Sequence, residues 1–384
     1  MASSTSSIFL LVILTFFTHS KILVRFHESV IPDNEPIPAP ANARMIRMGI
    51  FAMGLSSYMK AEVTKQLTAQ GDAHPHIQSL LQRLTQYSEN YVHFLEDIEI
   101  EVFPILMTEP KKSIKRKMRH LKGVLLTGGA PGIQMDGHPS ELEEIHVSDT
   151  STKKYFKVVN SILKYATKIN DDGRPFIIYG ICMGFESMVL FESDYEVPLT
   201  IISKKNVSDK VYLTHNGKSF SSYLSSIPTS DWLTSFEKGG MFFFNEKGIA
   251  VTNFISNSSL RDNYDLLAYY TVTSEGSHET YVGAIQHKKY PFFAVQFHPE
   301  KVLYETSSHF LIDKSDESLR LAQMFQNYLT FMFKKFGVHN VWPDSDDSIM
   351  RNDEYVTVSR IGFYRNIRVF GNPDDLSVFE TSNF

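Results

Sequence analysis

The segment best suited to chemistry surrounds the only cysteine of the chain. Residues 179–186 read Tyr-Gly-Ile-Cys-Met-Gly-Phe-Glu, so Cys182 stands between two glycines directly after an apolar segment. Such glycines permit a sharp strand-to-helix turn that lifts a nucleophile out of a sheet. The turn would also place Cys182 at a helix N-terminus, where free N–H groups favour the thiolate. The alternative is an inert buried thiol, but the strand, the glycines and the sole cysteine coincide, which favours a nucleophile.

A thiol nucleophile needs a base, and the base needs a group that orients it. Residues 293–300 read Phe-Ala-Val-Gln-Phe-His-Pro-Glu. On a strand His298 and Glu300 would share a face, with Pro299 stiffening the link, so the carboxylate would hold the imidazole in one tautomer. Because the chain has 14 His, this pair alone would be interpreted as a surface feature. Together with the cysteine turn it predicts a catalytic triad.

Acyl transfer also needs N–H donors for the oxyanion. The amide of Met183, which follows the nucleophile, is one candidate, and the turn at Gly128-Gly129 after an apolar segment is the natural second source. Glycine pairs at strand ends are usually only turns. Here they would let backbone N–H groups point at a ligand.

The elements that must position these residues follow an α/β pattern. Apolar strand-like runs without in/out alternation are separated by helix-length segments, which predicts a mostly parallel sheet covered on both faces. The expected strands are 45–53, 98–106, 123–129 and 175–179, and the expected helices are 77–95, 155–169 and 316–336. Residues 281–287 and 292–297 predict a hairpin at the sheet margin, and 355–370 predict a further strand-like segment that folds back. One large domain is preferred over two.

The N-terminal residues have a composition of their own. A largely apolar run, residues 8–17, is too short to span a bilayer and is followed by small residues, so residues 1–20 are interpreted as a secretory signal peptide. Residues 21–44 are an extended, partly Pro-rich lead. N-glycosylation sequons at Asn206 and Asn257 give weak support to entry into the secretory pathway.

Composition excludes several classes of protein. The 384 residues carry 38 Lys+Arg and 43 Asp+Glu, a net charge of −5, which argues against a bulk electrostatic grip on nucleic acid or on an anionic membrane. One cysteine leaves no partner for a disulfide, a cysteine-based zinc site or an iron–sulfur cluster. The basic run at 111–119 is best explained as the solvated face of a helix.

At this point the motifs match a known family. Residues 179–186, Leu126-Thr-Gly-Gly129 and Gln296-Phe-His-Pro-Glu-Lys301 resemble the class I glutamine amidotransferase-like fold and, within it, the γ-glutamyl hydrolases, also called folate hydrolases. The narrower match rests on Gly-Phe-Glu after the cysteine, on residues 91–96 before a strand ending at Pro104, and on Tyr290-Pro before the His segment. The resemblance covers about residues 46–336.

The resemblance implies a flavodoxin-like three-layer α/β/α sandwich with a mostly parallel central sheet. It implies a hydrolase domain at 45–340, with residues 341–384 packing on it as a tail. Cys182 would attack the γ-glutamyl amide and form a thioester, His298 would transfer protons and Glu300 would orient His298. Gly129 and Met183 would form the oxyanion hole, and Gly128 and Asn245 would contact substrate. Asn245 stands where relatives usually carry a His, which puts substrate affinity in doubt.

The same resemblance implies a substrate class and a location. The expected substrates are folylpoly-γ-glutamates, cleaved in lysosomes, vacuoles or secretions, with no metal or other cofactor, no nucleic acid and no stable membrane insertion after signal cleavage. The sequence leaves open whether the protein forms a homodimer. Two alternatives remain: a glutaminase that feeds ammonia to a partner, and a binding or scaffold protein that keeps the fold without turnover. Rapid alkylation of Cys182, blocked by substrate, would separate an active site from a scaffold.

Overall fold

Parallel strands form the centre of the computed structural model, which describes residues 46–69, 74–129, 150–214, 217–274, 277–337 and 354–380. Their order across the sheet is β3, β1, β4, β5 and β11, with bounds Ile100–Leu106, Ile46–Gly54, Gly123–Leu126, Ile177–Ile181 and Phe292–Val295. Every residue of β4, β5 and β11 is buried. Strands of this kind are covered on both faces, as the lack of alternation predicted.

Antiparallel strands extend the sheet beyond β11. They are β10 (Ser277–His287), β9 (Tyr264–Ser274) and β7 (Tyr212–Leu213). The predicted pairing of 281–287 with 292–297 is confirmed, because Ala284 lies opposite Val295. Its predicted place at the sheet margin is wrong, because β9 and β7 continue the sheet beyond β10. Strands β6 (Thr200–Asp209) and β8 (Met241–Gly248) form a separate two-stranded sheet.

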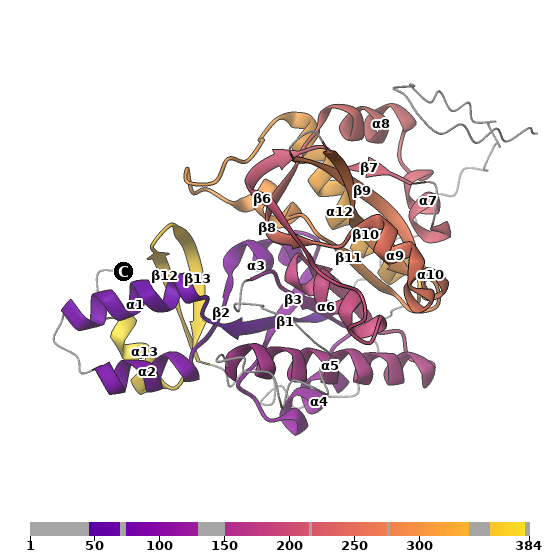
Figure 1. Ribbon diagram of the computed structural model, residues 1–384. Helices are drawn as coiled ribbons and strands as arrows, with labels where there is room; N and C mark the ends of the chain where they lie inside the picture. Colours follow the sequence, from indigo (N-terminus) through magenta and orange to yellow (C-terminus); the bar gives the residue numbers. More distant parts are fainter. Residues whose placement is uncertain are drawn as a thin grey trace, which may run out of the picture. The chain divides into compact units, whose positions relative to one another are not determined.

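Helices cover the two faces of the sheet with separate apolar cores. Figure 1 shows α3 on one side of β1 and α4 and α5 on the other. One core joins a face of the strands to α3, α7, α8 and α12, whose bounds are Glu89–Glu96, Lys218–Leu224, Thr229–Lys238 and Asp316–Lys335. The other joins the opposite face to α4 (Lys111–Arg119), α5 (Thr150–Asp171), α6 (Met183–Glu192), α9 (Val251–Ser256) and α10 (Ser258–Asn263). The fold is therefore the predicted flavodoxin-like three-layer sandwich.

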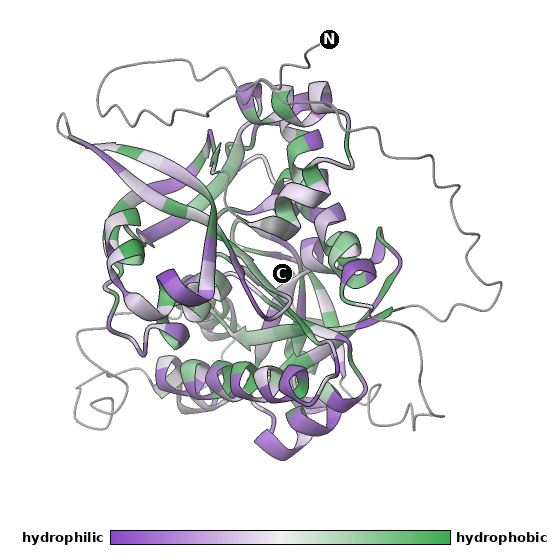
Figure 2. Ribbon diagram, turned by 90° about the vertical axis from the view of Figure 1, so that its right-hand side faces the viewer, coloured by the Kyte–Doolittle hydropathy of each residue, from purple (hydrophilic) through white to green (hydrophobic). Residues whose placement is uncertain are grey.

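Adjacent residues of one strand enter different cores. Tyr179 of β5 packs in the first core, whereas Ile178 packs in the second. In Figure 2 hydrophobic residues predominate along the central strands, while the surrounding helices alternate between hydrophobic and hydrophilic stripes. The predicted helices 155–169 and 316–336 are confirmed as α5 and α12, and Gly337, with φ +61°, follows the second of them.

The predicted helix over 77–95 is wrong, because a strand interrupts it. The segment forms α2 (His74–Arg83), β2 (Thr85–Ser88) and α3. Strand β2 pairs with β1 on one side and with β13 (Tyr364–Phe370) on the other, so a distant part of the chain decides its conformation. Ser88 then begins α3, since its hydroxyl accepts a hydrogen bond from the Asn90 N–H at 3.2 Å. Pro104 also lies inside β3 rather than at its end.

A third apolar core belongs to a module built from both ends of the described chain. It joins α1 (Ser57–Ala69) and α2 to the hairpin of β12 (Tyr355–Ile361) and β13, and to α13 (Pro373–Glu380). The expected strand-like segment at 355–370 is thus a β-hairpin. It continues the sheet through β2, and Figure 1 shows the module at its left.

The predicted signal peptide and lead, residues 1–44, lie outside the described residues, as does part of the predicted tail. Within the described ranges, no helix combines the length and hydrophobicity needed to cross a membrane.

Candidate active site

Cys182 occupies the sharp turn that the sequence predicted. It follows the last residue of β5 and has φ 54° and ψ −107°, a conformation that residues other than glycine rarely adopt. Helix α6 begins at the next residue. A Cβ atom on Gly184 would lie 2.3 Å from the carbonyl oxygen of Leu126, so only glycine allows α6 to approach β4 this closely.

His298 and Glu300 form the predicted pair. Nδ1 of His298 lies 2.7 Å from Oε1 of Glu300, and both side chains are buried. The expected strand geometry is wrong, however. Strand β11 ends at Val295, and His298 is the residue before α11 (Pro299–Tyr304), so Glu300 reaches back from the first turn of that helix. Proline is well suited to this first helical position because its fixed φ fits the helix.

Gly128 brings the thiol and the imidazole to the same point. A Cβ atom on Gly128 would lie 2.8 Å from Cε1 of His298, 3.1 Å from Cβ of Cys182 and 3.0 Å from the hydroxyl of Tyr91. The Gly128 N–H donates to that hydroxyl at 2.9 Å. This N–H therefore already has a hydrogen-bond partner. On the side that faces the cysteine and the histidine, Gly128 has no side chain to separate them.

Tyr91 is a site residue to which sequence reasoning gave no role. It is buried on α3, and burial together with the neighbouring Glu300 and Cys182 raises the pKa of Tyr91 well above its usual value. Its hydroxyl thus stays protonated and links the Gly128 turn to the His298–Glu300 pair. In the sequence, only its place in the motif at residues 91–96 pointed to a role for Tyr91.

The environment of the Cys182 thiol opposes ionisation in the resting site. Burial raises the pKa of Cys182, and the carboxylates of Glu186 and Glu300 raise it further. Hydrogen bonds from the Met183 N–H and the Gln296 amide lower the pKa of Cys182. The sequence predicted that the helix N-terminus would favour the thiolate. Burial outweighs that effect, because moving a charge out of water costs more free energy than the N–H groups of one helical turn provide.

Gln296 connects the nucleophile to a second buried carboxylate. Its Nε2 donates to Oε1 of Glu186 at 3.1 Å and lies 3.9 Å from Sγ of Cys182. Burial raises the pKa of Glu186 to about 7. Both residues lie in the motifs around Cys182 and His298, but their contact could not be predicted from the sequence, because it joins the residue after β11 to α6 across 110 residues.

The remaining predicted residues make different contacts. The N–H of Met183 faces the sulfur, as its effect on the pKa of Cys182 indicates. Gly129 packs against Met53, where a Cβ atom would overlap Sδ at 2.1 Å. Asn245 is buried on β8, and its Nδ2 donates to the carbonyl of Lys247 at 2.6 Å and to the Tyr270 hydroxyl at 3.4 Å. Its contact with substrate stays a prediction.

No group of three His, Cys, Asp or Glu side chains that would hold a metal occurs in the described parts of the chain.

A cysteine in a strained turn after a buried parallel strand, close to a His–Glu pair in an α/β/α sandwich, is an arrangement suited to acyl transfer through a thiol. The sequence model of the class-I glutamine amidotransferase family matches residues 80–317. The chain belongs to that family.

Its similar curated relatives carry a narrower name. It is 27% identical over 252 residues to γ-glutamyl hydrolase 1 of Arabidopsis thaliana, covering 65% of this chain and 66% of the relative. It is 26% identical over 242 residues to the γ-glutamyl hydrolase of Homo sapiens, covering 62% of this chain and 69% of the relative. The chain thus spans about two thirds of the length of these relatives.

Proposed function

We propose that the protein is a cysteine-dependent hydrolase of γ-glutamyl bonds, with folylpoly-γ-glutamates as its substrate class. The observation that carries the proposal is the convergence of Cys182 and His298 on Gly128, with Glu300 bonded to the far nitrogen of the imidazole. The relatives named γ-glutamyl hydrolase support the choice of bond.

In the proposed reaction His298 takes the proton of the Cys182 thiol as the sulfur attacks the γ-amide carbonyl. The carbonyl oxygen becomes an oxyanion, which the Met183 and Gly129 N–H groups stabilise. His298 then returns the proton to the leaving amine, and a thioester remains on Cys182. A water molecule gives a proton to His298 and attacks the thioester, which frees the γ-carboxylate and restores the thiol. Glu300 keeps Nδ1 protonated, so that Nε2 is the nitrogen that exchanges protons.

The raised pKa of Cys182 agrees with this order of events. A thiol that is neutral at rest must lose its proton as it attacks, and an adjacent imidazole is the group that removes it. A resting thiolate–imidazolium pair is not needed.

Two fluorescent peptides that differ only in linkage test the proposal. The wild-type protein should release the fluorophore from a γ-glutamyl peptide and leave the α-linked isomer intact. The Cys182→Ala variant should release it from neither. Release from the α isomer alone, or undiminished release by Cys182→Ala, would contradict the proposal.

The burial of the thiol also favours a second candidate, a binding protein of the same fold without turnover. The rate of Cys182 alkylation near neutral pH separates the two. A hydrolase predicts alkylation that substrate blocks and that His298→Asn slows, because the imidazole no longer assists loss of the thiol proton, whereas a binding protein predicts a sluggish thiol whose rate His298→Asn leaves unchanged.

We further propose that the protein enters the secretory pathway and works in a lysosome, a vacuole or the extracellular space. The apolar run at residues 8–17 supports the route. With a pKa of about 7, Glu186 is neutral in an acidic compartment, where it no longer opposes ionisation of the thiol. N-terminal sequencing of the protein purified from cell fractions tests both statements; an intact N-terminus in a cytosolic fraction would contradict them.

A further inference from the structure

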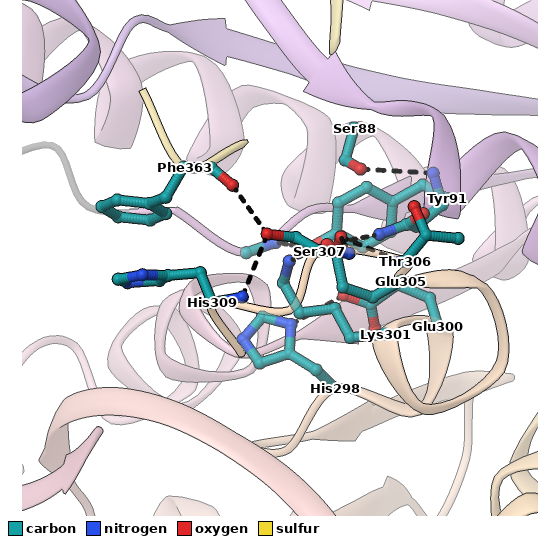
Figure 3. Close-up of polar contacts among 12 residues, drawn as sticks. Ser88, Tyr91, His298, Glu300, Lys301, Glu305, Thr306, Ser307, His309 and Phe363 are labelled. Atoms are coloured by element: carbon teal, nitrogen blue, oxygen red, sulfur yellow. Dashed lines mark hydrogen bonds and ion pairs between the residues drawn. The ribbon is translucent and has the colours of Figure 1, made fainter. Parts of the chain in front are cut away.

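The tip of the C-terminal hairpin contacts the loop that follows the catalytic helix α11. Strands β12 and β13 are joined by Gly362 and Phe363, with Ile361 paired to Tyr364. Gly362 has φ +61° and Phe363 a negative φ, which is the pattern of a tight type II′ turn. The carbonyl oxygen of Phe363 accepts a hydrogen bond from Oγ of Ser307 at 3.1 Å (Figure 3).

A buried carboxylate holds that loop in place. Glu305 accepts hydrogen bonds from Asn90 of α3 at 3.0 Å and from Lys301 of α11 at 2.9 Å. Its other oxygen accepts the N–H groups of Thr306 and Ser307 at 3.1 and 2.9 Å (Figure 3). The hairpin tip is therefore attached to the same rigid assembly that positions His298 and Glu300.

Aromatic rings gather at this tip. The ring of His309 stacks on Phe363 with centroids 4.3 Å apart and planes 14° apart, as Figure 3 shows. Tyr58 and Tyr364 lie against the same ring, each at 4.4 Å. The tip thus presents several flat faces in close contact.

A continuous series of ring contacts leads from the tip to the catalytic imidazole. Tyr364 contacts Phe310 at 6.3 Å, Phe310 contacts Phe242 at 5.7 Å, and Phe242 contacts His298 at 6.3 Å. Burial, with Tyr58 and then Cys182 and Glu305 adding to it, raises the pKa of Tyr364 to about 12. The phenol of Tyr364 is therefore within electrostatic range of the nucleophile.

Buried aliphatic side chains hold the hairpin on the protein, and among the rings Tyr364 also packs against their core. The hairpin is anchored by the third apolar core, to which Val358, Ile361, Ile367 and Val369 contribute from its strands. By contrast, Tyr58 is 43% exposed, His309 is exposed, and Phe363 and Tyr364 are only partly buried. Large rings left open to solvent beside a catalytic pair indicate a surface that binds a ligand.

We propose that Tyr58, His309, Phe363 and Tyr364 form an outer subsite that stacks on a planar aromatic group carried by the substrate near the scissile bond. The inference rests on the proposed function and names a specificity element within it. The family model ends at residue 317, so the hairpin is a feature of this chain outside the matched region. A flat ring suits the subsite because His309, Tyr58 and Tyr364 lie at 14°, 35° and 36° to the plane of Phe363, a geometry that a further ring extends.

Two substrates that differ only in a ring test the subsite. They are N-benzoyl-γ-glutamylglutamate and N-acetyl-γ-glutamylglutamate. Phe363→Ala and Tyr364→Ala should raise KM for the benzoyl substrate about twofold to tenfold, the usual range for one aromatic pair, with kcat nearly unchanged. Both constants for the acetyl substrate should stay as in the wild type.

Two further variants control for loss of structure. Tyr364→Phe keeps the ring and should restore the wild-type KM. Tyr355→Ala removes an exposed tyrosine, 46% accessible, from the far end of the same hairpin and should change neither substrate. Equal changes for both substrates in Tyr364→Ala, or no change for either, would overturn the subsite.

A binding measurement separates failure of the subsite from failure of the proposed function. Calorimetry on the Cys182→Ala variant compares N-benzoylglutamate with N-acetylglutamate, without turnover. A ring preference that Tyr364→Ala removes would support the subsite even if the wild type cleaves no γ-glutamyl bond. Equal binding of the two compounds would overturn it even if the wild type is an active hydrolase.

Discussion

The Nδ1 atom of His298 lies 2.7 Å from Oε1 of Glu300, and the two residues are joined by a proline at the start of a helix. The contact therefore bridges the last residue before α11 and its first turn, and it occupies Nδ1 rather than Nε2 of the imidazole. A fully buried carboxylate in this position fixes the orientation and the tautomer of the ring.

The His298–Glu300 contact predicts unequal losses of activity. His298→Asn removes the proton acceptor, so kcat should fall by about a thousandfold or more. Glu300→Gln keeps an oxygen that can accept from Nδ1, so its loss should be clearly smaller. Single-turnover kinetics of thioester formation measure both. Equal and mild losses at the two positions would contradict the assigned roles.

The conformation of Cys182 predicts that glycine is better tolerated there than alanine. With φ at 54°, any residue with a Cβ atom is strained, by an amount on the order of 1–3 kcal/mol. Cys182→Gly and Cys182→Ala should both be inactive, yet the glycine variant should have the larger free energy of unfolding. Urea titrations compare the two variants. A less stable glycine variant would show that the turn stores no strain.

The buried Glu186 predicts an unusual dependence of stability on pH. Its pKa rises from an ordinary 4.5 to about 7, so between these values the folded state holds the proton more tightly than the unfolded state. The contribution of Glu186 to the free energy of unfolding is therefore greatest below pH 4.5 and falls as pH rises to 7. Glu186→Gln should remove this slope. The difference between variant and wild type is the quantity to measure, because His287, whose burial lowers its pKa to about 4, contributes with the opposite sign.

The same residue predicts a change in thiol reactivity. After burial, Glu186 is the largest influence that raises the pKa of Cys182. Glu186→Gln should therefore speed alkylation of Cys182 by iodoacetamide at pH 8, where the wild-type carboxylate is charged. At pH 5 the two proteins should react at similar rates, because the wild-type carboxylate is then neutral. A rate difference that is the same at both pH values would exclude the electrostatic explanation.

The sequence predicted those parts of the site that depend on local order. The cysteine turn needs only a strand, two glycines and a helix that follow one another, and all of these can be read from residues 175–190. The His298–Glu300 pair was also predicted, although the residues after Val295 form a helix rather than a strand. Its spacing of two residues brings the side chains together in either arrangement.

The parts that were missed depend on contacts between distant segments. Tyr91 meets Gly128 only after α3 packs on the sheet, and Gln296 meets Glu186 only when β11 pairs with β5. The interruption of the helix predicted at 77–95 has the same origin, because β2 is fixed by pairing with β13 from the C-terminal hairpin. Local periodicity was overridden there by tertiary pairing.

The bare side of Gly128 provides the sharpest test of the site geometry. In Gly128→Ala the new methyl group would come within 3.1 Å of the histidine, the tyrosine and the cysteine at once, so at least one of them must move. Turnover should fall by at least a hundredfold, since a displacement of about 1 Å costs that much in a positioned site. Gly173→Ala is the matched control. Gly173 is exposed with no atom within 4 Å of a new Cβ, and its φ of +78° makes the substitution cost about 1 kcal/mol of stability with activity retained. Full activity in Gly128→Ala would mean that Cys182 and His298 do not meet where the structure places them.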